Sequence, residues 1–438
     1  MTGLLTRPQP RRIPMYGWLT AEAVSLLGTR VSMIAIPWLV LTTTGSPTRT
    51  GLVAFAEITP MVVLKAFGGP LVDRVGPRRM AITADAISFL VVGLIPLLHN
   101  AGALTFPMLL ALVAVAGGLR GPGDAATTAM IPALVERAGV PYERATGLSS
   151  AIERGATMIG AAIAGGLVAT VGAANAVAVD ALSFAACALL LLVTTRSLGG
   201  TRRHDAAQED AQEDGQEDGA QPAATSYVAE LRDGWNFLRR DAVLMSLCLM
   251  VAVTNLLDLA WSAVLLPVWA HDSGAGVGAV GLVFSVWGGA SMLGSVVAAA
   301  YGTRLPRLQT YLVAFLITGL PRFVLFAIGV PIWIILVMCL VGGASSGFLN
   351  PVIGAVEFER IPRAMVGRVM ALMSSVCWSL MPLGGILGGV LVSGIGLSPA
   401  LLATGVAYFV ATMAPALLPS FRGMNRQVPV EDAEPVAV

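Results

Sequence analysis

The sequence predicts an all-α integral membrane protein with twelve transmembrane helices in two pseudo-symmetric six-helix halves. Its 438 residues are 56% hydrophobic and only 12% charged, with a mean hydropathy of +0.78, which is more apolar than soluble domains are. Twelve segments reach the roughly 20 mostly apolar residues needed to cross a ~30 Å hydrocarbon core. A hydrophilic acidic stretch separates the sixth segment from the seventh. These observations together favour two helical bundles joined by a polar linker.

The predicted spans follow one another closely within each half. They cover residues 15–43, 51–71, 80–99, 103–130, 145–169, 173–195, 243–269, 277–301, 308–330, 331–355, 367–393 and 397–418. The corresponding domains are an N-terminal half at 1–196, a cytoplasmic linker with an interfacial helix at 197–240, a C-terminal half at 241–420 and a cytoplasmic tail at 421–438.

The linker divides into two parts of different composition. Residues 207–226 repeat a short acidic unit and hold almost nothing that a core would bury, so we expect disorder there. The next segment, SYVAELRDGWNFLRRD, places Val228, Leu231, Trp235 and Leu238 on one helical face. An amphipathic helix of this kind is expected to lie on the inner membrane surface.

The basic residues predict the orientation of the chain. With the N-terminus inside, the basic residues outside the spans lie almost entirely in cytoplasmic tails and loops, and Arg49 alone is external. Because short cytoplasmic loops retain Lys and Arg, both termini are predicted to be cytoplasmic. Lys65 is the only lysine beside many arginines, which is typical of a GC-rich bacterial genome and suggests a bacterial plasma (inner) membrane.

The two halves also show traces of duplication. Residues 135–172 align with residues 358–395 at a constant offset, which matches Glu136-Arg137 with Glu359-Arg360 and Gly165-Gly166 with Gly388-Gly389. Internal repeats of this kind are common in transporters.

Several function classes are disfavoured by the inventory of residues. A net charge of +1 without a basic stripe gives no surface for nucleic acid. The four cysteines are far apart and lie in apolar segments, so neither a metal site nor a disulfide framework is indicated; they are Cys187, Cys248, Cys339 and Cys377. The histidines, His99, His204 and His271, have no nucleophile or metal-ligand pattern nearby. We therefore expect neither an enzyme nor a metalloprotein.

The loop between the second and third spans carries a family signal. It reads Gly69-x-x-x-Asp73-Arg74-x-Gly76-x-Arg78-Arg79. In a chain of six plus six spans, this motif resembles the major facilitator superfamily. Within it, LLGTRVSMIAIPWLVLTTTGSPTRTGLV and the later GRVMAL are similar to 12-span bacterial drug exporters, which include macrolide, tetracycline and Tap-type efflux pumps.

The resemblance implies a conformational latch formed by Gly69, Asp73, Arg74, Gly76, Arg78, Arg79 and Glu136. Asp73 would lie near the start of span 11, at 365–368, where unpaired N–H groups favour a carboxylate. Arg78 or Arg79 would hold Asp73 and reach toward Glu136. The alternative is that these charges only set the topology.

Ionisable residues inside spans predict the coupling machinery, because such groups are costly in lipid and face a partner or a watery cavity. Our proton-coupling candidates are Glu22, Arg120, Asp124 and Glu153. The segment around Arg120, LRGPGDAA, partly resembles a span 4 motif whose arginine takes part in proton coupling, and Pro122 is expected to loosen the helix there. A structural Arg120–Asp124 pair is the alternative.

Span 1 departs from its relatives, because Thr29 follows Gly28 where many have an acid. Either Glu22 or Glu153 has taken over proton exchange, or the protein is not a proton antiporter. Lys65 and Asp85 lie near predicted span ends, where snorkelling or capping explains them.

The substrate-cavity candidates are Arg30, Asn255, Asp258, Trp261 and Asn350. The resemblance implies a cavity lined by spans 1, 4, 7 and 10. Asp258 lies halfway along span 7, with Trp261 and Asn255 on the same helical face. The alternative is a structural pair between Asp258 and Arg322.

These expectations describe a monomeric secondary active transporter in the lipid bilayer. It would export amphipathic small molecules, drugs above all, in exchange for protons, with the proton gradient as energy source and no cofactor. The alternatives are export of a siderophore or lipid-like metabolite, and a non-transporting membrane sensor or scaffold.

Overall fold

The computed structural model describes residues 12–66, 68–196, 227–301, 305–362, 365–418 and 421. These residues form helices joined by short turns, and no strand occurs among them. The predicted acidic tract at 207–226 and the tail from 422 onward lie outside the described residues.

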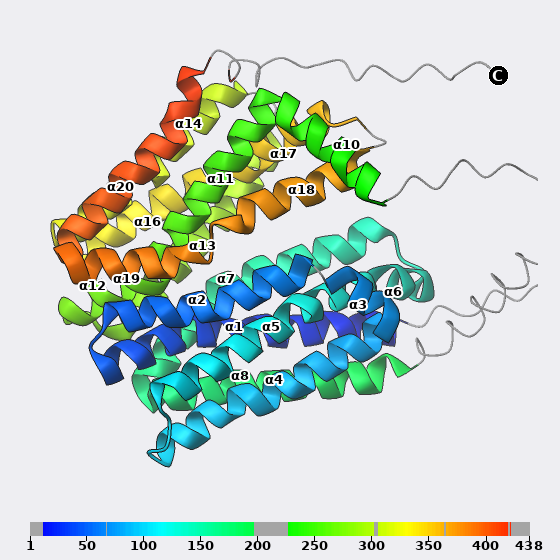
Figure 1. Cartoon of the computed structure of the whole chain (residues 1–438), viewed down its shortest axis with the longest axis horizontal. Helices are drawn as coiled ribbons and strands as arrows, with labels where there is room; N and C mark the ends of the chain where they lie inside the picture. The colour runs from blue at the N-terminus through cyan, green and yellow to red at the C-terminus, as the bar shows by residue number, and fades with distance from the viewer. Residues whose placement is uncertain are drawn as a thin grey trace, which may run out of the picture. The chain divides into compact units, whose positions relative to one another are not determined.

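The described residues up to 196 form the helices of the first part of the chain (Figure 1). They are α1 (Ile13–Thr44), α2 (Pro47–Ala66), α3 (Gly68–Val75), α4 (Pro77–Asn100), α5 (Phe106–Ala129), α6 (Ile131–Ala138), α7 (Tyr142–Val171) and α8 (Ala173–Thr194).

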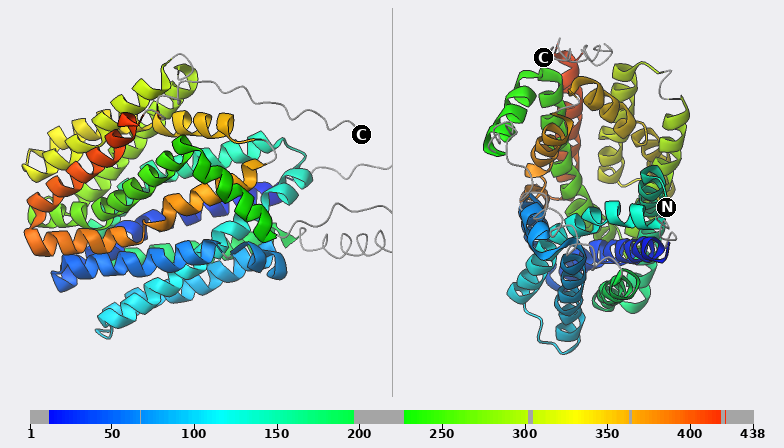
Figure 2. Two further views of the ribbon diagram at one scale, coloured as in Figure 1. Left: turned by 45° about the horizontal axis from the view of Figure 1, so that its top comes forward. Right: turned by 90° about the vertical axis from the view of Figure 1, so that its right-hand side faces the viewer.

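The second part begins with the amphipathic helix α10 (Tyr227–Arg240). It continues with α11 (Ala242–Ala260), the π-helix η2 (Trp261–Leu265), α12 (Leu266–Asp272), α13 (Gly276–Tyr301), α14 (Arg307–Thr318), α15 (Leu320–Ala327), α16 (Ile332–Ser346), α17 (Leu349–Arg360), α18 (Val366–Ser379), α19 (Leu383–Ile395), α20 (Leu397–Met413) and the short η5 (Ala414–Leu417). Figure 2 shows the long helices of each part lying alongside one another.

Eleven helical segments of the described chain are long and apolar enough to span a membrane. They correspond to eleven of the twelve predicted spans. The remaining span, predicted at 51–71, corresponds to α2, a 20-residue helix that contains Arg49, Glu57 and Lys65; these charges lower its hydropathy. Its predicted end at 71 is wrong, because α2 ends at Ala66 and the loop motif begins a separate helix, α3, at Gly68.

Several spans of the second part consist of two consecutive helices. Gly319 separates α14 from α15, and Pro321 stands in the first turn of α15. Pro382 lies between α18 and α19. A proline lacks the N–H that would continue the preceding helix, so helix breaks at these points follow from the sequence.

Residue contacts divide the chain into two compact units. Unit 1 comprises residues 1–36 and 56–222, and unit 2 comprises residues 37–55 and 223–438. The predicted halves differ from these units at 37–55, which the N-terminal half included. This segment packs within unit 2: the Trp38 ring contacts the His271 ring at 6.1 Å, and Thr48 Oγ1 lies 2.8 Å from Ser393 Oγ.

Glycines bring helices close together in both units. A Cβ at Gly121 of α5 would lie 2.7 Å from the Met61 carbonyl oxygen and 2.8 Å from the Lys65 nitrogen of α2. A Cβ at Gly389 of α19 would lie 2.8 Å from the carbonyl oxygen of Pro47. Such contacts require residues without side chains, and the contact at Gly121 holds α5, which lines the cavity described next, against α2.

Candidate functional site

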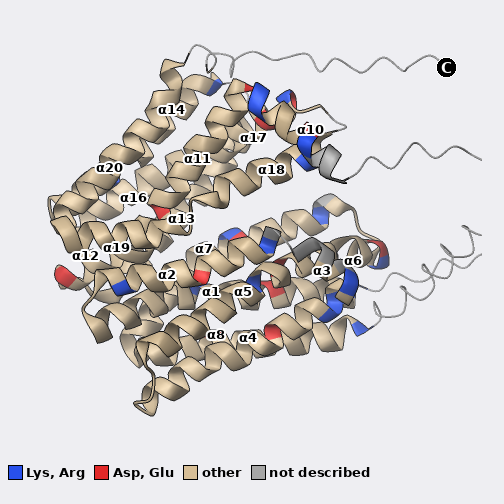
Figure 3. Cartoon of the chain, in the orientation of Figure 1, with Lys and Arg blue, Asp and Glu red and all other residues tan. Residues whose placement is uncertain are grey.

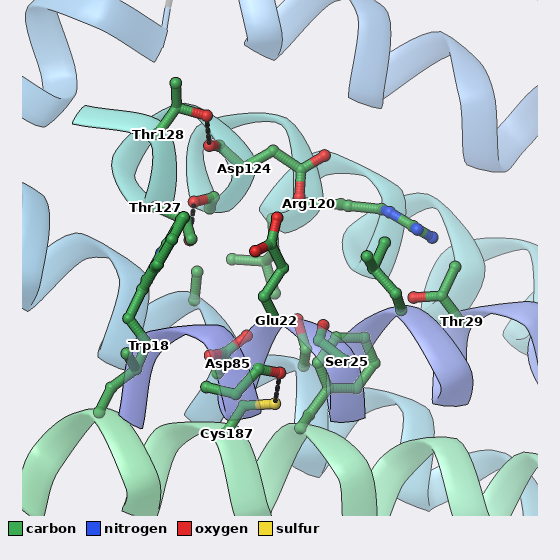
Figure 4. Close-up of a pocket in the computed structure, with 18 of the residues that line it drawn as sticks. Trp18, Glu22, Ser25, Thr29, Asp85, Arg120, Asp124, Thr127, Thr128 and Cys187 are labelled. Atoms are coloured by element: carbon green, nitrogen blue, oxygen red, sulfur yellow. Dashed lines mark hydrogen bonds between the residues drawn. The ribbon is translucent and has the colours of Figure 1, made fainter. Parts of the chain in front are cut away.

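A cavity of about 230 Å³ lined by several ionisable side chains lies inside unit 1 (Figure 4). Its walls come from α1, α4, α5, α7 and α8, with Ile131 of α6. The lining contains four carboxylates, Glu22, Asp85, Asp124 and Glu153, and one guanidinium, that of Arg120. A concentration of ionisable groups is costly between membrane-spanning helices, so it marks a functional cavity.

One wall of the cavity is a single face of helix α1. Trp18, Glu22, Ser25 and Thr29 line the cavity, and their spacing places them on one face of the helix. Figure 4 shows the Glu22 side chain extending from α1 toward the turn of α5 that carries Asp124. The sequence-predicted coupling residues Glu22, Arg120, Asp124 and Glu153 thus come together around a single cavity.

The predicted loosening of span 4 around Pro122 is wrong. Helix α5 runs without interruption from Phe106 to Ala129, with Pro122 inside it. The glycines before the proline serve packing instead: Gly117 and Gly121 let the α5 backbone approach α2. The helix ends later, at Ala129, and Met130 separates it from α6, whose first turn contains Pro132.

The two carboxylate oxygens of Glu22 have different surroundings. Its Oε1 accepts a hydrogen bond from Ser149 Oγ of α7 at 2.6 Å. Its Oε2 is buried and makes no hydrogen bond within the described residues, and the same holds for Nε1 of Trp18. Buried polar atoms are rarely left without a partner, so these two atoms indicate a place for water, a proton or a ligand.

Arg120 is not bound to a carboxylate. Within the described chain, no salt bridge joins it to Asp124, Glu153 or Glu22. In Figure 4 its guanidinium extends along α1 toward Thr29, away from the Asp124 carboxylate. The structural Arg120–Asp124 pair considered from the sequence is therefore not formed here.

Asp85 is a cavity residue that the sequence reasoning missed. It lines the same cavity from α4, although its position near a predicted span end suggested capping. Its position could have indicated this role, because Asp85 lies two full turns inside α4, beyond Arg78 and Arg79. Arg30, a predicted substrate contact, instead donates from Nη2 to Thr157 Oγ1 of α7 at 2.9 Å.

Unit 2 holds a second charged site, formed by Asp258 of α11 and Arg322 of α15. Arg322 Nη2 donates to Asp258 Oδ1. The Arg322 side chain is 6% exposed and that of Asp258 is 42% exposed. Four rings surround the guanidinium carbon, with centroids 4.6–5.4 Å away: Trp261, Trp287, Phe323 and Tyr408. Aromatic faces attract a cation, so Arg322 is fixed by both charge and rings.

The other substrate-cavity candidates have different surroundings. Trp261 is only 5% exposed and packs against Phe284 and Phe326. Asn255 Nδ2 donates to the carbonyl oxygen of Cys377 on α18 at 3.0 Å. Asn350 is exposed, near the start of α17. On the predicted face, the Trp261 ring is therefore packed against other rings, and the Asn255 amide is hydrogen-bonded to the backbone.

The loop motif covers most of α3, the turn at Gly76 and the start of α4. Gly69 and Asp73 belong to α3, and the side chain of Asp73 lies outside the described residues. Gly76 has a φ of 93°, a backbone conformation that suits glycine. Arg78 donates to Thr195 Oγ1 and to the Leu192 carbonyl oxygen, both at 3.0 Å. Arg78 therefore binds the end of α8, and a contact with Glu136 of α6 stays a prediction.

The sequence matches a family model over nearly its whole length. Residues 18–262 and 249–435 match the model of the Major Facilitator Superfamily. The chain belongs to this superfamily. The predicted fold class and family resemblance are confirmed, and the chain is a multi-pass membrane transporter.

Two of the proteins to which the chain is similar are multidrug efflux pumps. The multidrug efflux pump Tap of Mycobacterium tuberculosis is 28% identical over 417 residues, covering 94% of this chain and 95% of that protein. Tap of Mycolicibacterium fortuitum is 27% identical over 425 residues, covering 96% and 98%.

Two solved transporters share the fold. The nucleoside transporter NupG has a TM-score of 0.70 at 13% identity, covering 92% of this chain and 98% of that one. A D-xylose-proton symporter has a TM-score of 0.66 at 14% identity, covering 96% and 98%. At such identities the likeness shows the fold alone.

Proposed function

We propose that this superfamily member exports amphipathic small molecules, drugs in particular, across the bacterial plasma membrane in exchange for protons. The observation that carries the proposal is the cavity of unit 1, whose lining holds four carboxylates and one guanidinium and where Glu22 Oε2 has no hydrogen-bond partner within the described residues. The similarity to Tap pumps over 94% of the chain supports drugs as the substrate class.

The charge balance of the cavity explains how protons would take part. Several carboxylates in a small space repel one another, and the single positive charge of Arg120 can offset the charge of only one of them. Proton binding to one carboxylate therefore affects proton binding to the others. Ser149 orients Glu22 by donating to Oε1, which leaves Oε2 to take and release a proton. Movement of α1 against α5 or α7 would change these distances and hence the affinity for protons.

Alternating access would join proton binding to substrate movement. The transporter would bind substrate in one conformation, release it in another, and bind protons for the return step. No cofactor is needed for this cycle, and a monomer holds all of its parts.

The distribution of charge supports a cytoplasmic location of both termini. Figure 3 shows charged residues gathered at the end of unit 1 where α3 and α6 lie, and at the end of unit 2 where α10 lies. Arg74, Arg78, Arg79 and Arg239 belong to these groups. Basic residues of short loops stay on the cytoplasmic side.

The test is ethidium export from pump-deficient bacteria that express the chain, after a growth-inhibition panel has identified the compounds against which it protects. Glu22→Gln removes the titratable oxygen but keeps the hydrogen bond from Ser149, so we expect export to fall by about a hundredfold at equal membrane expression. Asp272→Asn, an exposed acid beside His271, is the matched control and should export normally. Full export by Glu22→Gln would contradict the proposal.

A further inference from the structure

Asp180 of α8 is a deeply buried acid outside the cavity of unit 1. Its exposed fraction is 3%. Ser32 of α1 donates a hydrogen bond to Oδ2. The Ser183 hydroxyl donates to the Asp180 backbone carbonyl at 2.8 Å and reaches Oδ1 only at 3.3 Å. A carboxylate offers about four acceptor positions, and the described residues supply the bond from Ser32 and the longer one from Ser183.

The surroundings of Asp180 do not neutralise a negative charge. No salt bridge to Asp180 occurs in the described part of the chain. On the helices packed against α8, residues 86–98 of α4 and 155–171 of α7 contain no ionisable side chain. Arg120 of α5 favours the charged form of Asp180 and Glu57 of α2 opposes it, and the effect of Arg120 is the larger of the two.

The nearest charged residue of α1, Arg30, donates to Thr157 of α7. A buried carboxylate without a counter-ion carries a heavy desolvation penalty. Binding of a proton removes this penalty, so Asp180 is suited to take up and release one.

Asp180 lies one helical turn beyond the cavity. On α8, Phe184, Cys187 and Leu191 line the cavity, and Asp180 precedes Phe184 by four residues. On α1, Thr29 lines the cavity and Ser32 follows it by three residues. Both helices thus carry the Ser32–Asp180 hydrogen bond at the same end of the cavity, toward the start of α8.

Gly28 keeps room for this group. A Cβ there would lie 2.6 Å from Asp180 Oδ1 and would also collide with Ser183 Oγ. The absence of a side chain lets the carboxyl group reach the backbone of α1. A glycine next to Thr29 therefore serves the placement of an acid that belongs to another helix.

We propose that Asp180 is a proton-transfer site in series with the acid cavity, taking protons from the membrane side at which α8 begins. This inference rests on the proposed proton exchange. Asp180 gives its carboxyl proton to an ionised carboxylate of the cavity, Glu22 or Asp124, through water. The Asp180 carboxylate that remains keeps the hydrogen bond from Ser32 and takes a new proton from the solvent on its own side.

The test uses the full chain in proteoliposomes with ethidium as the probe. Asp180→Asn keeps an acceptor oxygen for Ser32 but cannot carry a proton. We expect ethidium counterflow without a gradient to stay within about twofold of wild type, and transport driven by a pH gradient to fall by about tenfold or more. Asp272→Asn is the control and should match wild type in both assays.

The outcomes separate this inference from the proposed function. If wild type shows counterflow but no response to a pH gradient, the proposed proton exchange fails and the inference fails with it. If wild type responds and Asp180→Asn responds equally, only the role of Asp180 is overturned. A parallel loss of counterflow and gradient-driven transport in Asp180→Asn would show a structural role.

If Asp180→Asn does not fold, Asp180→Glu tests whether Asp180 transfers protons. It retains an exchangeable proton on a longer side chain, so we expect gradient-driven transport with a displaced pH profile. Intact counterflow without any gradient-driven transport in Asp180→Glu would overturn the proposal.

Discussion

Asp258 and Arg322 join α11 to α15 through an ion pair whose arginine is almost completely buried. Breaking such a pair from one side leaves a buried charge without its partner. We therefore expect Asp258→Asn to lower the free energy of unfolding by about 3 kcal/mol, visible as a lower thermal midpoint and poorer expression.

The double variant separates a structural pair from a substrate contact. Arg322→Gln added to Asp258→Asn removes the unpaired charge, so stability should partly return, with no such return for Arg322→Gln added to the control Asp272→Asn. A well-folded Asp258→Asn that selectively loses transport of cationic compounds would instead support the exposed carboxylate as a substrate contact.

At the level of single residues, the sequence predicted which helices carry charge but not which charges meet. The cost of ionisable groups in lipid singled out Glu22, Asp124 and Glu153, which share one cavity. Ser149 and Asp85 were missed, because their contribution depends on contacts between helices distant in sequence. The partners of Arg78 and Asn255 are backbone and hydroxyl atoms, which no charge pattern reveals.

Helix α5 gives the clearest test at the level of elements, because its Gly121 meets different surroundings from Gly155 of α7. A Cβ at Gly121 would meet backbone atoms of α2 that cannot rotate away, whereas a Cβ at Gly155 would meet nothing within 4 Å. Gly121→Ala should cost about 1–3 kcal/mol of stability through overpacking, while Gly155→Ala should be neutral or slightly stabilising because alanine favours helices. Thermal unfolding followed by size-exclusion chromatography compares the two, and equal midpoints would contradict close α2–α5 packing.

The amphipathic helix α10 shows what periodicity alone leaves open. The sequence placed Trp235 and Leu238 on one face, yet Leu238 is fully buried in a cluster with Leu244, Val369 and Met373, whereas Trp235 is 41% exposed. An apolar stripe predicts a buried face, but the packing partner decides which part of the stripe it covers. The side chains of Val228 and Leu231 lie outside the described residues.

For the whole molecule, hydropathy sufficed to predict the fold, because a bilayer accepts backbone only in helices or closed barrels. Eleven predicted spans have matching helices, and α2 matches the other with a shorter length. The sequence did not predict that residues 37–55 would pack within unit 2. That grouping depends on small-residue contacts such as Gly51 against Gly385, which hydropathy does not record.

Coupled transport is a property of the whole molecule, since protons bind in unit 1 in our account and substrate must cross the membrane. In this mechanism, ethidium and protons move across the membrane in opposite directions. The most direct measurement uses purified chain in proteoliposomes, where an ethidium gradient is the only energy source and a trapped dye reports the internal pH. We predict a proton flux opposite to the ethidium flux, which Glu22→Gln abolishes and Asp272→Asn leaves unchanged; ethidium movement without proton flux, or flux of both in one direction, would contradict the account.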